Sequence, residues 1–281
     1  MEIHSVKGGL AAHIRAHLSE LRDTEARVAQ VVLDKGAELV HLSVSDVATL
    51  AGTAPSSVVR ACQRLGFRGY QELKIAAARQ APAPEPSRDR DPAARALTDT
   101  VRAAREALDG VVATVSPDQL REAAGMIDAA HRVLVVGAGL SGAVALDTAY
   151  RLRALGCAVD APADPLTAQL AASQLTPADV CLAISHTGAT RSTVDAARRA
   201  RQAGAPVVAL TSYARSPLTE SSNRTLVAGG QDLVFGLETV ASRLAHLTVI
   251  DALALTLLGL RGEPAEAALR LAADVTVDHS Y

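Results

Sequence analysis

Five short apolar runs in the second half of the chain constrain its fold more than any other feature. The first four are separated by segments long enough for a helix, and a shorter segment precedes the fifth, weaker run. Continuous apolar strands that alternate with helices are typical of a parallel sheet covered on both faces. The sequence therefore predicts an α/β domain with a five-stranded parallel sheet flanked by helices, its strands at residues 133–136, 158–159, 180–184, 207–210 and 225–227.

The loop after the first predicted strand contains the spacing Gly-x-Gly-x-x-Gly at Gly137, Gly139 and Gly142, and Asp160 follows 18 residues later. In a dinucleotide-binding fold these glycines would bring the pyrophosphate to a helix N-terminus, and Asp160 would bind a ribose. The same short motif also forms any tight strand-to-helix turn. A nicotinamide- or flavin-dependent redox protein therefore stays open as one interpretation.

The loop after the third predicted strand favours a different ligand. Residues 185–190 read Ser-His-Thr-Gly-Ala-Thr and precede a predicted helix. Three hydroxyl groups, a glycine that allows close backbone approach and the amides of a helix N-terminus together form a cradle for an anion. Taken alone, the same residues would also serve as a simple helix cap. A phosphomonoester fits this loop, whereas a dinucleotide fold has no need of hydroxyl groups here.

Residues 41–74 predict two short helices around a tight turn. Ser43 is suited to cap the first helix, with Asp46 reciprocating three residues later. Gly52 provides a left-handed residue to end that helix, and Pro55 suits the first turn of the second. Apolar residues recur at helical spacing in both helices, which predicts a buried stripe on each. This is the arrangement of a helix-turn-helix.

The outward face of the second helix predicts contact with DNA. Its side chains carry hydroxyl, amide and guanidinium groups, which reach base edges and phosphates in helix-turn-helix proteins. Between residues 60 and 79 there are five basic residues against Glu72 alone, although an ordinary solvated helix face would show the same pattern. The predicted DNA-binding residues are Ser56, Ser57, Arg60, Gln63, Arg64 and Arg68.

Residues 57–74 resemble the N-terminal domain of the RpiR/MurR family, bacterial regulators that respond to phosphosugars. The resemblance implies a DNA-binding helix-turn-helix. One departure is Ala54, where the family usually has a serine at the start of the recognition helix; the side-chain cap is lost unless Thr53 takes that role. The matching residues are Val58, Val59, Arg60, Leu65, Gly66, Phe67, Gly69, Tyr70 and Lys74.

The two loops of the predicted sheet, taken together, resemble the sugar isomerase (SIS) domain, which binds phosphosugars. The family pattern Gly-x-Gly-x-Ser matches residues 137–141, and Ser-x-Ser-Gly-x-Thr matches residues 185–190 with Thr187 replacing the second serine. A Ser-Pro-Leu turn at residues 216–218 also matches, and the resemblance covers roughly residues 105–260. It implies a phosphosugar site that contains Gly139, Ser141, Ser185, Thr187, Gly188, Thr190 and Glu238.

A phosphosugar isomerase is a further alternative, and such an enzyme needs an acid/base pair. His186 lies in the anion loop, while Glu238 and His246 are eight residues apart, close to two helical turns. We expect His246 to be a structural histidine on an apolar helix. The basic, hydroxyl-bearing helix at residues 55–65 argues against an enzyme, so no catalytic residue is assigned.

The chain of 281 residues has room for about two domains. Residues 81–93 contain four prolines and dense alternating charge, which favours an extended linker. We predict a DNA-binding domain at residues 1–80, a linker and the start of a connecting helix at residues 81–104, and a SIS domain at residues 105–281. Aromatic residues make up only 2% of the chain, so alanine, valine and leucine must fill both cores.

The three cysteines are isolated and lack metal-ligand spacing, which is typical of a protein from a reducing compartment. We expect no signal peptide, and we expect the apolar segment at residues 244–260 to be a buried helix because His246 and Asp251 interrupt it. These features predict a cytoplasmic transcriptional regulator, a homodimer or homotetramer that binds double-stranded operator DNA. The expected effector is a phosphorylated sugar, with no cofactor, no metal and no membrane contact.

Overall fold

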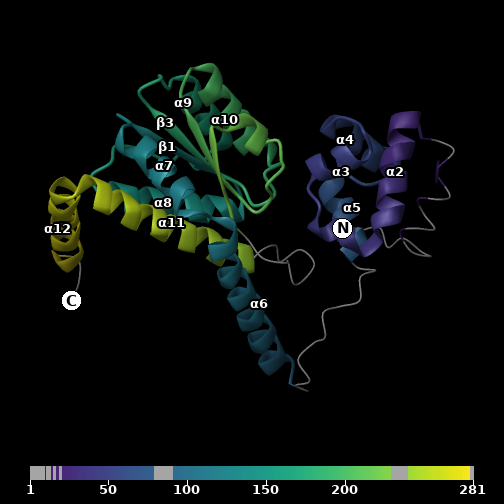
Figure 1. Cartoon of the computed structure of the whole chain (residues 1–281), viewed down its shortest axis with the longest axis horizontal. Coiled ribbons are helices and arrows are strands. Elements are labelled where there is room, and N and C mark those ends of the chain that lie inside the picture. The colour runs from purple at the N-terminus through teal and green to yellow at the C-terminus, as the bar shows by residue number, and fades with distance from the viewer. Residues whose placement is uncertain are drawn as a thin grey trace. The chain divides into compact units, whose positions relative to one another are not determined.

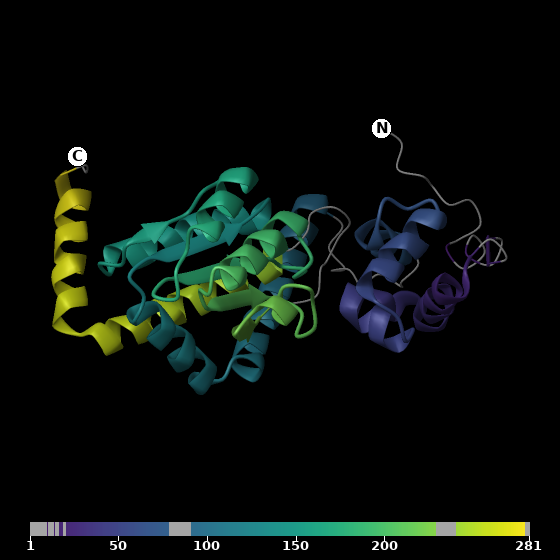
Figure 2. The ribbon, with the colours of Figure 1, turned by 90° about the horizontal axis from the view of Figure 1, so that it is seen from above.

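The computed structural model of the chain describes residues 10, 14, 17, 18, 21–78, 91–228 and 240–278. These residues fall into two compact units, and the boundary between the units lies within one helix, between Asp99 and Thr100. Figures 1 and 2 show a helical first unit and an α/β second unit.

The described residues of the first unit form helices around one core of valine, alanine and leucine side chains. Tyr70 is buried in this core, and its hydroxyl donates a hydrogen bond to the carbonyl of Leu42 at 2.9 Å. This bond fastens the last helix to the segment that leads into the helix-turn-helix. The elements are α2 (Asp23–Lys35), the 3-10 helix η2 (Gly36–His41), α3 (Val44–Leu50), α4 (Pro55–Arg64) and α5 (Tyr70–Ala78).

Helices α3 and α4 form the predicted helix-turn-helix. The Ser43 hydroxyl accepts a hydrogen bond from the Asp46 amide at 3.1 Å, and the Asp46 carboxylate accepts one from the Ser43 amide at 2.9 Å. Gly52 has φ of 59° after the end of α3, as expected of a left-handed residue. The N-cap of α4 is Ala54, which makes no side-chain cap. Thr53 therefore does not replace the missing serine.

Of the side chains that we predicted to point outward, Ser57 is buried, whereas Arg64 is exposed as predicted but is held in an ion pair. Ser57 is only 6% exposed, and its hydroxyl accepts a hydrogen bond from Arg60 at 2.9 Å. Arg64 has an accessible side chain, but its Nε atom lies 3.1 Å from the buried carboxylate of Glu25 on α2. A buried carboxylate needs a charged partner, and the sequence pattern of α4 alone contains no sign of one. Ser56 and Gln63 are exposed as predicted.

The second unit contains the predicted five-stranded parallel sheet, with strand order β2-β1-β3-β4-β5. Gly137 at the end of β1 lies beside Ile184 at the end of β3, and Ile184 lies beside Leu210 of β4. The loops that follow these three strands therefore leave the same edge of the sheet. The strands are β1 (Val133–Gly137), β2 (Val159–Asp160), β3 (Val180–Ile184), β4 (Val207–Thr211) and β5 (Arg224–Val227).

Helices cover both faces of this sheet. In Figure 1, α9 and α10 lie together on one face, and α7, α8 and α11 lie on the other. The side chains between the sheet and the first pair are largely alanines, so these helices pack closely without aromatic residues. The helices are α7 (Pro117–Asp128), α8 (Leu140–Ala154), α9 (Pro165–Ser173), α10 (Arg191–Gln202), α11 (Val240–Arg261) and α12 (Glu263–Asp278), with a 3-10 turn η3 (Thr219–Ser221).

Helix α11 is the element that we predicted as a buried helix. By length and composition its residues 241–261 would suffice to cross a membrane, and 33% of the apolar stretch within them is buried. The helix packs against α7 and α8, and Ala245, Val249 and Leu253 on that side are buried. Leu255 is 67% exposed, so the prediction of burial is right for one side of α11 only.

Helix α6 (Pro92–Thr114) connects the two units. Most of the proline-rich linker predicted at residues 81–93 lies outside the described residues. Its last residues are helical, because Pro92 occupies the first turn of α6, where its missing amide hydrogen has no cost. The domain boundaries at residues 80 and 104 stay predictions.

Replacing Arg64 with alanine is expected to destabilise the chain rather than only to weaken DNA binding. The change leaves the buried Glu25 carboxylate without its charged partner, with only the hydrogen bond from the Arg22 amide at 3.0 Å. Breaking a fully buried ion pair costs about 3–5 kcal/mol, and the partial exposure of Arg64 reduces our expectation to about 1–2 kcal/mol. Urea unfolding measures this free energy, with Gln63→Ala on the exposed face of α4 as the matched control. Equal stability of the two variants would contradict this account of Arg64.

Candidate functional site

The loops that follow β1, β3 and β4 meet at the carboxyl edge of the sheet. The chain leaves β1 toward β2 on one side, whereas β3 lies on the other side. This is a topological switch point, the place where open α/β sheets bind ligands. The candidate site is therefore the group of loops that begin at Gly137, Ile184 and Thr211.

The β1 loop approaches its helix very closely. A side chain on Gly137 would place its Cβ 2.6 Å from the carbonyl oxygen of Ser141, so glycine is required there. The Ser141 hydroxyl accepts a hydrogen bond from the amide of His186 at 3.4 Å. Ser141 thus connects the β1 loop to the β3 loop, and these two loops were predicted to act together.

The β3 loop leads directly into the N-terminus of α10. Thr190 is the N-cap of this helix and makes no side-chain cap bond, while the amides of the first helical turn have no partners within the helix. Ser185 is fully buried, and its hydroxyl donates a hydrogen bond to Thr190 Oγ1 at 3.1 Å. The hydroxyl hydrogen of Thr190 therefore points elsewhere, and the hydroxyl can donate to an anion held by the helix amides.

Gly188 holds the β3 loop against the Ser-Pro-Leu turn. Its φ is 61°, and a side chain at this position would overlap the side chain of Ser216. The amide of Leu218 donates to the Gly188 carbonyl at 2.9 Å. The Ser-Pro-Leu turn thus acts as a support under the β3 loop, which gives a physical reason for the presence of both motifs.

A chain of polar side chains runs from the β3 loop to α11. Ser212 Oγ lies 2.9 Å from His186 Nδ1 and 3.1 Å from His246 Nε2, and donates to the Ala228 carbonyl at 2.8 Å. His246 Nε2 also lies 2.9 Å from that carbonyl. A carbonyl oxygen only accepts, so the proton of neutral His246 is on Nε2.

Burial, together with the nearby His186, lowers the pKa of His246 to about 4, against the opposing effect of its bond to Ala228. The ring is therefore neutral at physiological pH. His246 is buried and hydrogen bonded, as expected of a structural histidine.

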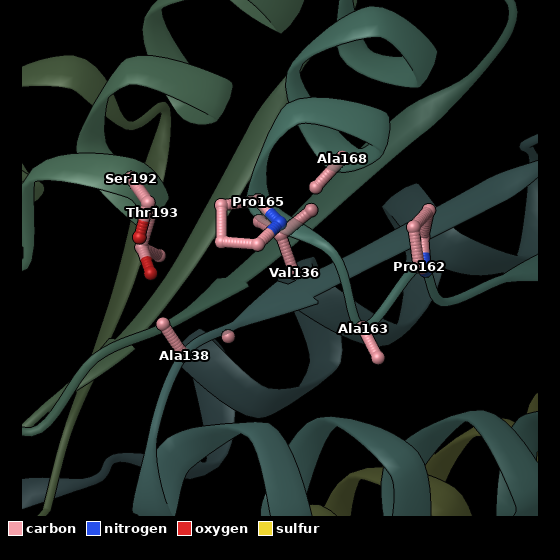
Figure 3. A pocket seen from close by; sticks show the side chains of 9 residues that line it. Val136, Ala138, Pro162, Ala163, Pro165, Ala168, Ser192 and Thr193 are labelled. Carbon is pink, nitrogen blue, oxygen red and sulfur yellow. The ribbon is translucent and has the colours of Figure 1, made fainter.

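A small recess lies beside the β3 loop, between β1, the segment before α9 and the first turn of α10. Its volume is about 10 Å³, which is room for roughly one water-sized group. Figure 3 shows Ala138, Pro162, Ala163 and Pro165 around it, with Thr193 on the α10 side. The Thr193 hydroxyl is buried and has no hydrogen-bond partner among the described residues.

The structure brings most of the predicted ligand residues together, and they come from two loops at one edge of the sheet. Gly139, Ser141, Ser185, Thr187, Gly188 and Thr190 all lie there. Glu238 lies outside the described residues, so its predicted place near the sugar and its pairing with His246 stay predictions. Asp160, the ribose ligand of the dinucleotide interpretation, is at the end of β2 and exposed.

The comparisons with known proteins agree with both halves of this architecture. The family described as "Helix-turn-helix domain, rpiR family" matches residues 8–83, and the SIS domain family matches residues 126–256. An HTH-type transcriptional regulator of Caldanaerobacter subterraneus is 30% identical over 247 residues, which cover 86% of this chain and 88% of that protein. HexR of Pseudomonas aeruginosa is 31% identical over 259 residues, which cover 87% of each chain. This chain belongs to the RpiR family of transcriptional regulators.

Solved structures share the RpiR-family fold. The Vibrio vulnificus NanR protein complexed with ManNAc-6P has a TM-score of 0.83 at 23% identity, covering 97% of this chain and 100% of that one. The sugar isomerase domain of an RpiR transcription factor from Sphaerobacter thermophilus has a TM-score of 0.56 at 26% identity and covers 63% of this chain and 98% of that one. The helix-turn-helix and SIS architectures predicted from the sequence are therefore confirmed.

Lowering the pH is expected to destabilise this RpiR-family chain through His246. The folded pKa of about 4 is below the ordinary value of 6.5, so the unfolded chain binds more protons below pH 6.5. The contribution of neutral His246 to the free energy of unfolding is fully present above the unfolded-state pKa. It decreases as the pH falls toward the folded-state pKa, and the loss is about 2 kcal/mol at pH 5. Urea unfolding from pH 7.5 to pH 5 measures this loss. His246→Gln should flatten this part of the profile, and an unchanged slope in that variant would contradict the assignment.

Proposed function

We propose that this RpiR-family regulator binds a phosphorylated sugar in its SIS domain and that the ligand alters its affinity for operator DNA. The observation that carries the proposal is the β3 loop, where the Ser185 hydroxyl orients Thr190 Oγ1 at the uncapped start of α10. Uncapped amides and an oriented hydroxyl are the groups that hold a phosphate at a helix N-terminus.

The phosphate would lie between the first turn of α10 and the hydroxyls of Ser141 and Thr190. The hydrogen bond from the His186 amide to Ser141 supports this geometry, because it holds the two loops together. Thr187 contributes a further hydroxyl, which accepts from the Ala189 amide at 3.2 Å and shapes the turn. The NanR protein of similar fold was solved in complex with ManNAc-6P, which supports a sugar phosphate as the class of ligand.

The recess beside Thr193 supports a place for one oxygen of the sugar. A buried hydroxyl without a partner costs about 1–3 kcal/mol, and a ligand or bridging water that reaches it would recover part of this energy. Its lining by alanine and proline side chains leaves room for one small group, which would favour sugars that present a hydroxyl there.

The exposed face of α4 would contact DNA. Ser56, Arg60 and Gln63 are exposed on it, and Arg60 is partly held by its bond to Ser57. Arg68 would bind a phosphate, since it pairs with Glu72 at 3.4 Å but its side chain is 76% exposed. Ser57 and Arg64 would act through the fold, as positioning residues for Arg60 and for α4.

We propose that the chain is not an enzyme and that it works in the cytoplasm as a homodimer or homotetramer. The regulator relatives support a non-enzymatic role. A phosphosugar isomerase is the competing function, because a protein of Listeria monocytogenes that is described as a sugar-phosphate isomerase shares the SIS fold. Incubation with aldose and ketose phosphates followed by product analysis separates the two, and turnover that is lost in His246→Gln would favour the enzyme.

The phosphate prediction uses paired variants of the β3 loop. Ser185→Ala and Thr190→Val each remove one hydroxyl, and each is expected to weaken sugar-phosphate binding by about 1.5–3 kcal/mol, measured by calorimetry. If Ser185 acts by orienting Thr190, the double variant should lose no more than Thr190→Val alone. Thr190→Ser is the control that keeps the hydroxyl. Equal affinity for a sugar and its phosphate would count against the site.

The coupling prediction concerns the operator. Saturating sugar phosphate is expected to change operator affinity by about 5- to 150-fold, the range of coupling free energies between two sites. Fluorescence anisotropy with a DNA site recovered by selection measures this at two salt concentrations, because affinity should fall steeply with salt. Ser185→Ala should shift the response to higher ligand concentration. An operator affinity unchanged by any ligand of a sugar-phosphate panel would refute the regulatory proposal.

A further inference from the structure

Helix α6 carries an apolar stripe, much of which stays exposed among the described residues. Leu97 is 67% exposed, Val101 39% and Leu108 37%. Within α6 the side chains recur at alternating spacings of four and three residues, at Leu97, Val101, Ala104, Leu108 and Val111. This alternation is the heptad pattern of a helix that packs against another helix. Figure 1 shows α6 as one straight helix, so the stripe is continuous along it.

We propose that α6 pairs in parallel with α6 of a second copy of this chain, as a short two-stranded coiled coil. The spacing places Val101 and Leu108 at the a positions and Leu97, Ala104 and Val111 at the d positions. A β-branched residue at position a next to leucine at position d, as at Val101 and Leu97, favours two strands. The stripe is also self-complementary, as an interface on a two-fold axis must be.

The charges on α6 select the parallel orientation. Arg102, Glu106 and Asp109 lie at the b and f positions on the back of the helix, where they stay in water. Arg105 is the charged residue beside the seam, at position e. In a parallel pair this arginine faces Thr100 of the second copy, at position g, whereas an antiparallel pair in register brings two copies of Arg105 together. Like charges that face each other are destabilising.

The location of α6 gives the pairing a consequence for DNA binding. Residues 79–91 separate the end of α5 from the start of α6, and a segment of this length spans at most about 45 Å. Two helix-turn-helix units tethered to one coiled coil can therefore reach half-sites one turn of DNA apart, about 34 Å. The tether also raises the effective concentration of the second unit into the millimolar range. This step rests on the proposed function, whereas the pairing itself does not.

Cysteine cross-linking of the full chain tests the pairing without DNA or sugar phosphate. The native cysteines Cys62, Cys157 and Cys181 are buried, so an introduced surface thiol is the reactive one. Val101→Cys at a seam position should form an intermolecular disulfide at least about tenfold faster than Asp109→Cys on the back of the helix. Equal rates would overturn the pairing. Disulfides formed only between Val101→Cys chains and Val111→Cys chains would show an antiparallel pair and overturn the parallel one.

A second variant separates this inference from the proposed function. Val101→Asp places a charge in the seam and should weaken binding to a two-fold DNA site at least about tenfold, since burial of a valine is worth more than that factor. Binding to a single half-site should not change, and the exposed position keeps the fold intact. Loss at both sites would overturn the role of α6 in pairing. Failure of the wild-type chain to bind any DNA, with the cross-link intact, would overturn the proposed function alone.

Discussion

The close approach of Gly188 to Ser216 is the contact on which the candidate site depends. There is no space for a side chain at Gly188, so the β3 loop lies directly on the turn that follows β4. This position fixes the direction in which α10 begins, and with it the amides of the first helical turn. Replacement of Gly188 by any other residue would lift the loop and misplace Thr190, whatever hydroxyls remained.

Small side chains also allow close approach between the elements in the core of the second unit. The chain has few aromatic residues, and alanines such as Ala172, Ala197 and Ala200 fill the space between the sheet and the pair α9 and α10. Each contributes little area, but closely packed helices have few ways to shift relative to the sheet. The carboxyl edge of β1, β3 and β4 is consequently a rigid base on which the loops position their hydroxyls.

The sequence was sufficient for the features that depend on neighbouring residues. The Ser43 cap, the five strands and the two loop motifs follow local rules of spacing and chemistry, and the structure contains them. It was insufficient where the partner lies far along the chain. The burial of Glu25 against Arg64 and the chain from His186 through Ser212 to His246 join separate elements, and no local pattern marks them. The lack of a hydrogen-bond partner for the buried Thr193 hydroxyl among the described residues could not be predicted either, because a buried threonine ordinarily finds a partner.

A site built from hydroxyls and amides also sets the scale of any regulation. A ligand shifts an equilibrium between two geometries only by its difference in affinity for them. One hydrogen bond to a charged group is worth about 1.5–3 kcal/mol, which lies within the usual coupling free energy between two sites of about 1–3 kcal/mol. A difference of one hydroxyl therefore accounts for a coupling of this size, if the hydroxyl of Thr190 reaches the ligand in one geometry and not in the other. The buried bond from Ser185 orients this hydroxyl, so its direction depends on the conformation of the β3 loop.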